Sequence, residues 1–153
     1  MAVDINETLD EFFETLSEYS DEAAQRKAIE AAKNLKPEYL SLLMAPYPKC
    51  GVNCAKVLSE LSDEVLRSHS TTLLEWISDM NYPGAEIILD RLKRFKDVSW
   101  LAVNIDRGVK EALLFDEQIW LCNIAELLDN ERLKPELPSD VYNVLYCRYK
   151  VNC

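Results

Sequence analysis

The sequence predicts an all-α protein built from antiparallel helical hairpins. Only three glycines occur among its 153 residues, whereas sandwiches and barrels usually need glycine at their many tight turns. Apolar residues recur at the three- and four-residue spacing of amphipathic helices, and no run alternates as a half-buried strand would. Apolar residues make up 48% of the chain and charged residues 29%. This composition is typical of a folded protein and predicts a single domain over residues 1–153.

The first predicted unit is an acidic helical hairpin at about residues 5–34. Phe12 and Leu16 lie on one face of its first helix, and Ser20 is expected to cap a second helix over residues 21–34. Pro37 favours the start of a short third helix. Two prolines and a glycine then predict a break over residues 45–52.

A repeat-like core is predicted at about residues 53–128. Ser62 can cap a short helix, and the Asn-Tyr-Pro-Gly step over residues 81–84 separates a helix over residues 71–80 from the one that follows. Three basic residues lie near the C-terminal end of this following helix, where the helix dipole favours cations: Arg91, Lys93 and Arg94.

Two further helices are predicted over residues 99–114 and 116–128, and Ser139 can cap a last helix at about residues 139–150. The two helices before the last are expected to bury their apolar residues, namely Trp100, Val103, Ile105, Val109, Leu113, Ile119, Trp120, Ile124 and Leu127. Short connections between successive helices predict antiparallel pairs. Such pairs could stack as HEAT- or armadillo-like repeats in a short superhelix, or pack as an irregular bundle.

The segment over residues 74–85 resembles the signature of a bacterial family of helical domains of unknown function, family 5071. The pattern E-W-x-x-D-x-N-aromatic-P is matched by Glu75, Trp76, Asp79, Asn81, Tyr82 and Pro83. Residues 116–120 form a second family-like element, and the resemblance spans about residues 57–128. It implies a HEAT-like fold without an established activity. Helical repeat proteins of this kind in bacteria often resemble immunity proteins, which neutralise a toxin by binding it.

The signature also has a structural interpretation. Trp76 lies on an apolar helix face, so its indole N–H is expected to find a local acceptor while the ring packs between helices. Asp79 or Asn81 can cap the helix that Pro83 opens. Trp100 and Trp120 are expected to be structural in the same way, as buried parts of the core.

The sequence indicates no enzyme, metal site or cofactor. A Ser-His-Asp or Cys-His arrangement needs a base, and the single histidine, His69, lies in a polar turn. Cys50 and Cys54 could join His69 around a metal, but the paired spacing of a structural zinc site is missing. No glycine-rich phosphate loop occurs.

The chain is expected to be cytoplasmic. Residues 1–10 carry three acids and no base, which does not fit a signal peptide, and no apolar run reaches the length of a membrane span. The odd number of cysteines favours free thiols in a reducing compartment: Cys50, Cys54, Cys122, Cys147 and Cys153.

Charge points to a protein partner. The net charge is −10, which disfavours nucleic acid and anionic membranes and attracts a basic protein. Residues 4–30 contain nine acids and two bases. The expected contacts are Glu11, Glu14, Glu18, Asp21 and Glu22, with Tyr82, Asp116 and Glu117 as a second patch. An acidic hairpin that serves solubility alone is the alternative for the first set.

The predicted function is therefore that of a non-enzymatic protein-binding module. The leading hypothesis is a cytoplasmic immunity protein that covers the active site of a basic toxin, such as a nuclease. A helical-repeat scaffold or adaptor that binds peptides or housekeeping proteins is the alternative. The sequence indicates no particular oligomeric state.

Overall fold

The computed structural model describes residues 5–44 and 49–151, with the side chains of residues 10–44 and 49–151. Its regular elements are all α-helices or short 3₁₀ helices, and no strand occurs in these residues, so the all-α prediction is confirmed. The elements in chain order are α1 (Ile5–Thr15), α2 (Glu22–Ala32), η1 (Pro37–Leu43), α3 (Gly51–Ser59), α4 (Asp63–Leu66), η2 (Arg67–His69), α5 (Ser70–Trp76), α6 (Ala85–Lys93), α7 (Ser99–Leu114), α8 (Gln118–Ala125), η3 (Glu126–Asp129), η4 (Glu131–Glu136) and α9 (Ser139–Val151).

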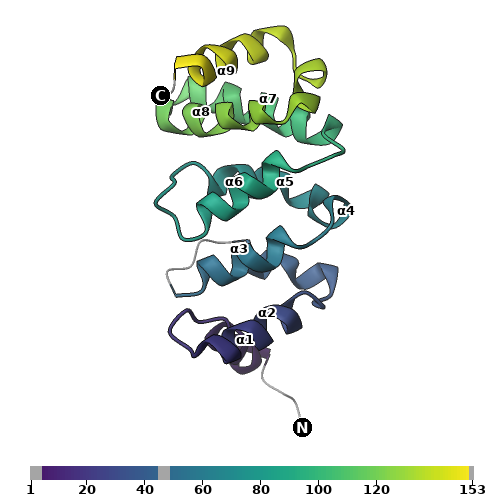
Figure 1. The fold of residues 1–153 in the computed structure, drawn as a ribbon, viewed down its shortest axis with the longest axis vertical. Coiled ribbons are helices and arrows are strands. Elements are labelled where there is room, and N and C mark those ends of the chain that lie inside the picture. Colours follow the sequence, from purple (N-terminus) through teal and green to yellow (C-terminus); the bar gives the residue numbers. More distant parts are fainter. Residues whose placement is uncertain (1–4, 45–48, 152–153) are drawn as a thin grey trace.

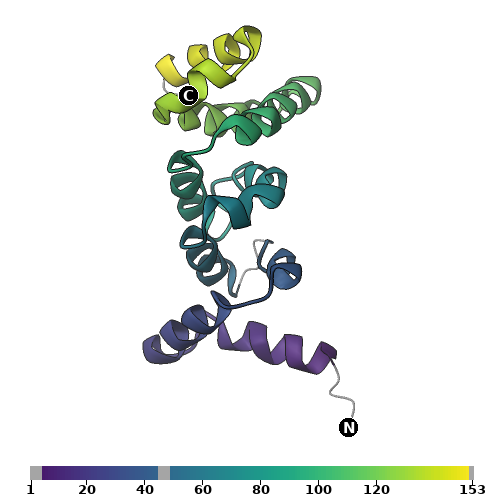
Figure 2. The ribbon, with the colours of Figure 1, turned by 90° about the vertical axis from the view of Figure 1, so that its right-hand side faces the viewer.

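The helices form an elongated stack. Figure 1 shows α1 and α2 at one end, α3, α5 and α6 in the middle, and α7, α8 and α9 at the other end. Turned by 90°, the stack shows two rows of helices (Figure 2). In one row α2 packs on α3, α3 on α6 and α6 on η3, while α5 packs on α7 in the other row. None of the described helices combines the length and the apolarity that a membrane crossing would require.

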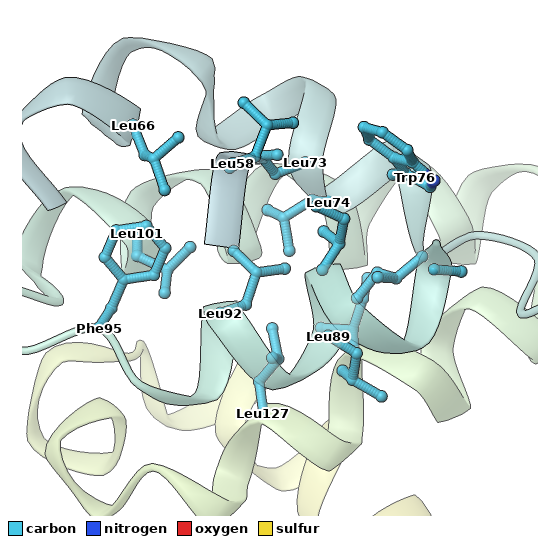
Figure 3. Packing of buried hydrophobic residues seen from close by; sticks show 14 of the residues in the cluster. Leu58, Leu66, Leu73, Leu74, Trp76, Leu89, Leu92, Phe95, Leu101 and Leu127 are labelled. Carbon is cyan, nitrogen blue, oxygen red and sulfur yellow. The ribbon is translucent and has the colours of Figure 1, made fainter. Parts of the chain in front are cut away.

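One hydrophobic core runs through the successive layers. Figure 3 shows Leu58 of α3, Leu73 of α5 and Leu92 of α6 pointing toward a common interior, and all three are fully or almost fully buried. Burying each such leucine contributes roughly 1.5–3 kcal/mol relative to leaving it exposed. The layers therefore depend on one another for stability, since each helix buries its apolar face against its neighbours.

Buried asparagines link consecutive layers through the carbonyls that helix ends leave without partners. Asn53 Nδ2 donates to the Leu16 carbonyl at 2.8 Å, just after α1 ends. Asn123 Nδ2 donates to Ile77 O at 2.8 Å, at the end of α5, and Asn130 Nδ2 donates to the Phe95 carbonyl at 2.7 Å, after α6. Leaving such a buried carbonyl unpaired costs about 1–3 kcal/mol, so these amides help to fix the order of the layers.

Most of the predicted helices occur, and their ends show where the predictions need correction. The helix over residues 99–114 has the predicted bounds. Asp21, not Ser20, caps α2, because its carboxylate accepts a hydrogen bond from Ala24 N at 2.9 Å. Ser62 caps α4 as expected, accepting from Val65 N. Pro46 and Pro48 of the predicted break lie outside the described residues, and α3 already begins at Gly51.

The helix after the Asn-Tyr-Pro-Gly step does not use the predicted cap. Asp79 Oδ1 instead accepts hydrogen bonds from both the backbone N–H and the side-chain amide of Asn81, each at 2.9 Å. The residue that precedes α6 is Gly84, which has a left-handed φ of 82° and no side-chain cap. The acid and the amide therefore shape the turn before Pro83, and the expectation that either caps α6 is wrong.

A buried ion pair joins the loop after α3 to α6. The Arg91 guanidinium lies 2.6 Å from Asp63 Oδ1 and also donates to the Leu61 carbonyl at 2.8 Å. Its Cζ lies 4.5 Å from the centre of the Phe95 ring. The second oxygen of Asp63 accepts from Lys96 N at 2.9 Å. This arrangement pairs both charges, with the Arg91 side chain buried and the Asp63 side chain partly exposed.

Stability is expected to fall as the carboxylate of Asp63 is protonated. Burial alone would raise the pKa of this carboxyl group. The hydrogen bonds from the Lys96 N–H and the Arg91 guanidinium outweigh that effect and hold the pKa below the ordinary 3.8. A carboxyl group whose pKa is lowered by folding stabilises the fold above its unfolded pKa and loses that contribution as pH falls through the folded pKa. Urea unfolding measured from pH 7 to 2 gives the free energy of unfolding of the unaltered chain and of Asp63→Asn. The difference between the two should shrink as the pH falls below 3.8. A difference that stays constant with pH would contradict this assignment.

Candidate protein-binding surface

The acids predicted as the first contact set lie on and beside the hairpin of α1 and α2. Glu11, Glu14, Asp21 and Glu22 are exposed, although Asp21 is also engaged as the cap of α2. Glu18 differs, because it is half-buried and its Oε2 is fully buried without a hydrogen-bond partner among the described residues. The hairpin therefore presents exposed carboxylates at one end of the stack, with Glu18 turned toward the interior.

The thiols beside Glu18 are poor nucleophiles. Cys50 and Cys54 are buried, and burial raises the pKa of both, with the Glu18 carboxylate raising it further. The thiolate is the reactive form of cysteine, so neither thiol is primed for attack at neutral pH. Cys147 is a free thiol as predicted, but that prediction is wrong for Cys122, which is disulfide-bonded. Cys153 lies outside the described residues.

His69 lies in the turn before α5. It precedes α5 at the cap position, is half-buried, and its side chain makes no capping hydrogen bond. Over residues 5–44 and 49–151, no three His, Cys, Asp or Glu side chains gather as a metal site would require.

The residues of the 74–85 signature hold the turn between α5 and α6. Trp76 is buried, and its indole Nε1–H donates to the Pro83 carbonyl at 2.9 Å, so the predicted local acceptor is confirmed. Tyr82 lies in the same turn and is exposed. These contacts give the signature a structural role in closing one layer of the stack.

The other two tryptophans also pack between layers. Trp120 is buried and donates its Nε1–H to the Leu74 carbonyl at 2.9 Å, which ties α8 to α5. Trp100 is half-buried and meets Phe95 edge to face, with ring centroids 5.0 Å apart. Edge-to-face pairs of this kind stabilise beyond the area that they bury.

The turn between α7 and α8 exposes apolar side chains that were expected to be buried. Leu113 and Ile119 were predicted in the core, yet they are 46% and 71% exposed, and Leu114 and Phe115 between them are 77% and 66% exposed. We call these four residues the α7–α8 patch. Val103, earlier on α7, is a further correction at 60% exposed. A group of large exposed apolar side chains within seven positions is typical of an interaction surface.

The backbone of this turn ends α7 with a left-handed residue other than glycine. Asp116 has φ of 57°, the only positive φ of a non-glycine residue in the described chain. Glu117 N donates to Ala112 O at 2.8 Å, and Asp116 N donates to Leu113 O at 3.4 Å. This is the Schellman arrangement, in which glycine usually takes the left-handed position. The predicted helix start at Asp116 is therefore wrong, and α8 begins at Gln118.

Substitution of Asp116 tests the demand for a left-handed backbone. Asp116→Val should lower the free energy of unfolding by about 1–2 kcal/mol, because a β-branched residue is strained at positive φ. Asp116→Gly should change it by less than about 1 kcal/mol, since glycine adopts this conformation freely. Urea denaturation followed by circular dichroism measures both changes. Equal stability of the two variants would contradict the backbone argument.

The predicted contact residues thus fall into three places. The acidic hairpin lies at one end of the stack and the α7–α8 turn in the layers at the other end (Figure 1). Asp116 and Glu117 are both exposed within the second place, beside the α7–α8 patch. Tyr82 lies in the separate turn between α5 and α6. Of these places, the structure combines acids with exposed large apolar residues most densely at the α7–α8 turn.

A cavity of about 1030 Å³ lies where the loops after α3 and α6 meet η4. Four basic residues line it, which sequence analysis did not bring together: Arg91, Arg94, Lys96 and Arg132. The remaining lining residues are Ser59, Glu60, Leu61, Ser62, Asp63 and Glu64. In the sequence, only the basic residues at the end of α6 pointed to this site, and the preference of helix C-terminal ends for cations was sufficient to account for them.

Comparison with known proteins identifies a family. A family model described as a domain of unknown function (DUF5071) matches residues 44–140. The match includes the 74–85 signature, the α7–α8 turn and the residues that line the cavity, and it leaves α1 and α2 outside. No curated protein matches the chain, and no solved structure matches it.

Proposed function

The chain belongs to the DUF5071 family of domains of unknown function, and we propose that it is a non-enzymatic module that binds a basic protein through the α7–α8 turn. The observation that carries this proposal is the exposure of Leu114, Phe115 and Ile119, each above 60%. Large apolar side chains gain most from contact when a partner removes them from water. Nothing within the described chain covers them.

The charge around the patch supports a basic partner. Asp116 and Glu117 lie inside the turn, and Glu111 is exposed one turn earlier on α7. An apolar centre with acids at its edge suits a partner surface of the opposite sign, because the apolar contact sets residence time and the charges orient the encounter. The net charge of −10 adds long-range attraction that accelerates association.

The acidic hairpin suits a supporting role in this scheme. Glu11, Glu14 and Glu22 are exposed carboxylates, but the hairpin lies outside the part of the chain that the family model matches. It would strengthen the attraction of a basic partner without forming the centre of the contact. Screening by salt should therefore weaken association mainly through its rate.

The specific form that we propose is an immunity protein of a HEAT-like, bacterial kind. The partner would be a basic toxin, such as a nuclease, whose active site needs cations to hold phosphate. Covering that site with an acidic, apolar-centred surface would block the substrate. A scaffold that binds peptides is the competing function, and it predicts several unrelated partners in place of one.

The test is affinity capture from the source organism with the tagged full chain, followed by titration of the captured protein at two salt concentrations. The proposal predicts one predominant basic protein, whose toxicity or nuclease activity the chain inhibits and whose association slows as salt rises. Several unrelated partners would favour the scaffold. A single partner that is acidic, or whose association rate ignores salt, would overturn the electrostatic part.

A further inference from the structure

Four of the ten residues that line the cavity between the loops after α3 and α6 are basic. Its cations come from the end of α6, the loop that follows and η4, and its carboxylates come from the loop after α3 and the start of α4. Pairing decides which of these charges are available. Arg91 and Asp63 neutralise each other, whereas Glu60 shares Lys33, which lies outside the cavity, with Glu30.

Three lining cations then remain without an ion-pair partner among the described residues, against Glu64 and a Glu60 that Lys33 neutralises only in part. Arg94 donates only to backbone carbonyls, those of Asp90 and Ser59, each at 3.4 Å. Lys96 and Arg132 are exposed, and Glu64 is a lining acid without an ion pair among the described residues. The cavity therefore keeps an excess of positive charge in a chain whose net charge is −10.

We propose that this cavity binds a small phosphorylated molecule. A phosphate group carries nearly two negative charges and several acceptor oxygens, which suits two guanidinium groups and one ammonium group. The Ser62 hydroxyl oxygen accepts from Val65 N, so its proton stays available for a phosphate oxygen. The cavity is open to solvent, so a small phosphorylated molecule can reach these cations directly.

The ligand is a small molecule and not a nucleic acid strand. A nucleic acid strand that extends along the stack would be repelled by the charge of −7 over residues 4–30. A ligand confined to the cavity senses mainly the charges that line it, because charges more than about 8 Å away are screened at physiological salt. The local excess of cations can therefore bind a small anion that the molecule as a whole would repel.

This site is distinct from the proposed protein contact. Lys96 precedes the first residue of α7, and the α7–α8 patch begins at its last turn. A helix of this length separates its two ends by about 24 Å. Ligand binding and partner binding can thus be measured independently, and failure of one leaves the other standing.

The experiment titrates the full chain with pyrophosphate, inorganic phosphate and succinate at constant ionic strength, by calorimetry and by backbone amide shifts. We expect pyrophosphate to bind more tightly than succinate and to shift the amides of residues 59–64 and 91–96. The double variant Arg94→Gln and Arg132→Gln should weaken pyrophosphate by at least about tenfold. The matched control is Arg26→Gln with Arg67→Gln, which removes two exposed arginines that do not line the cavity.

Each outcome decides the proposal. Equal binding of succinate and pyrophosphate would overturn the preference for phosphate, and equal weakening by the control pair would overturn the cavity as the site. A phosphoserine peptide that binds more tightly than pyrophosphate would overturn the small-molecule assignment. If the cavity variant fails to fold, the amide shifts that pyrophosphate causes in the unaltered chain still test the proposal. Shifts confined to residues outside segments 59–64 and 91–96 would contradict it.

Discussion

Replacing Gly84 with alanine is expected to lower the free energy of unfolding by about 3 kcal/mol or more. Gly84 has φ of 82°, and a Cβ there would lie 2.5 Å from Ala55 Cβ and 2.8 Å from the Gly51 carbonyl oxygen. Both contacts belong to α3, which carries much of the core, so relief would require α3 and α6 to separate. Strain and overlap therefore add at this position.

The matched control is Gly108→Ala. A Cβ at Gly108 would meet Ile124 and Trp120 at 3.7 Å, which is ordinary van der Waals contact. Because Gly108 lies inside α7, alanine should stabilise the helix by about 0.5–1 kcal/mol. Urea denaturation of the two variants should shift the midpoint in opposite directions. A Gly84→Ala protein as stable as the unaltered chain would show that α3 and α6 are not packed as described.

Replacing Arg91 with methionine should cost about 3 kcal/mol, near the lower end for a broken buried ion pair. Methionine fills part of the space but leaves Asp63 and the Leu61 carbonyl without the guanidinium. The cost stays near that lower end because the Asp63 side chain is 24% exposed and keeps its Lys96 N–H. Thermal and urea unfolding give the measurement.

Lys93→Met, on the same helix, is the control for this prediction. Lys93 pairs with Glu126 and Asp129, whose side chains are about half exposed. Exposed pairs contribute at most about 1 kcal/mol, since water and salt screen them. Equal losses for the two variants would contradict the special role that burial gives Arg91.

Helical periodicity predicted the fold class because each helix buries one face. It located α7 to the residue and identified Trp76 and Trp120 as core residues. It failed at Leu113, which shares the periodicity of the buried face of α7, and at Ile119 in the first turn of α8, since both lie at helix ends and are exposed. Periodicity gives the direction of a side chain, and only the tertiary arrangement decides whether something lies there.

Backbone conformation limited the prediction in a second way. Asp116 was expected to open the helix over residues 116–128. Its φ of 57° instead places it at the left-handed position that ends the preceding helix. Glycine there would have marked this position in the sequence, whereas aspartate fits both roles.

The basic cavity could not be predicted from sequence order. Its residues come from segments 59–64 and 91–96 and from Arg132. Each segment alone resembles an ordinary solvated turn or helix end. Only the stacking of α3, α6 and η4 brings their charges together, and only the ion pairs of Arg91 and Glu60 show which charges remain available.

The most direct test of the proposed contact is the affinity of the captured partner for a variant of the α7–α8 patch. Leu114→Ser, Phe115→Ser and Ile119→Ser together remove the exposed apolar centre, and Val103→Ser with Val151→Ser remove exposed apolar residues elsewhere. With folding checked by circular dichroism, the patch variant should bind at least about 100-fold more weakly, and the control within about twofold of the unaltered chain. Unchanged affinity of the patch variant would place the contact on another surface and contradict the proposal.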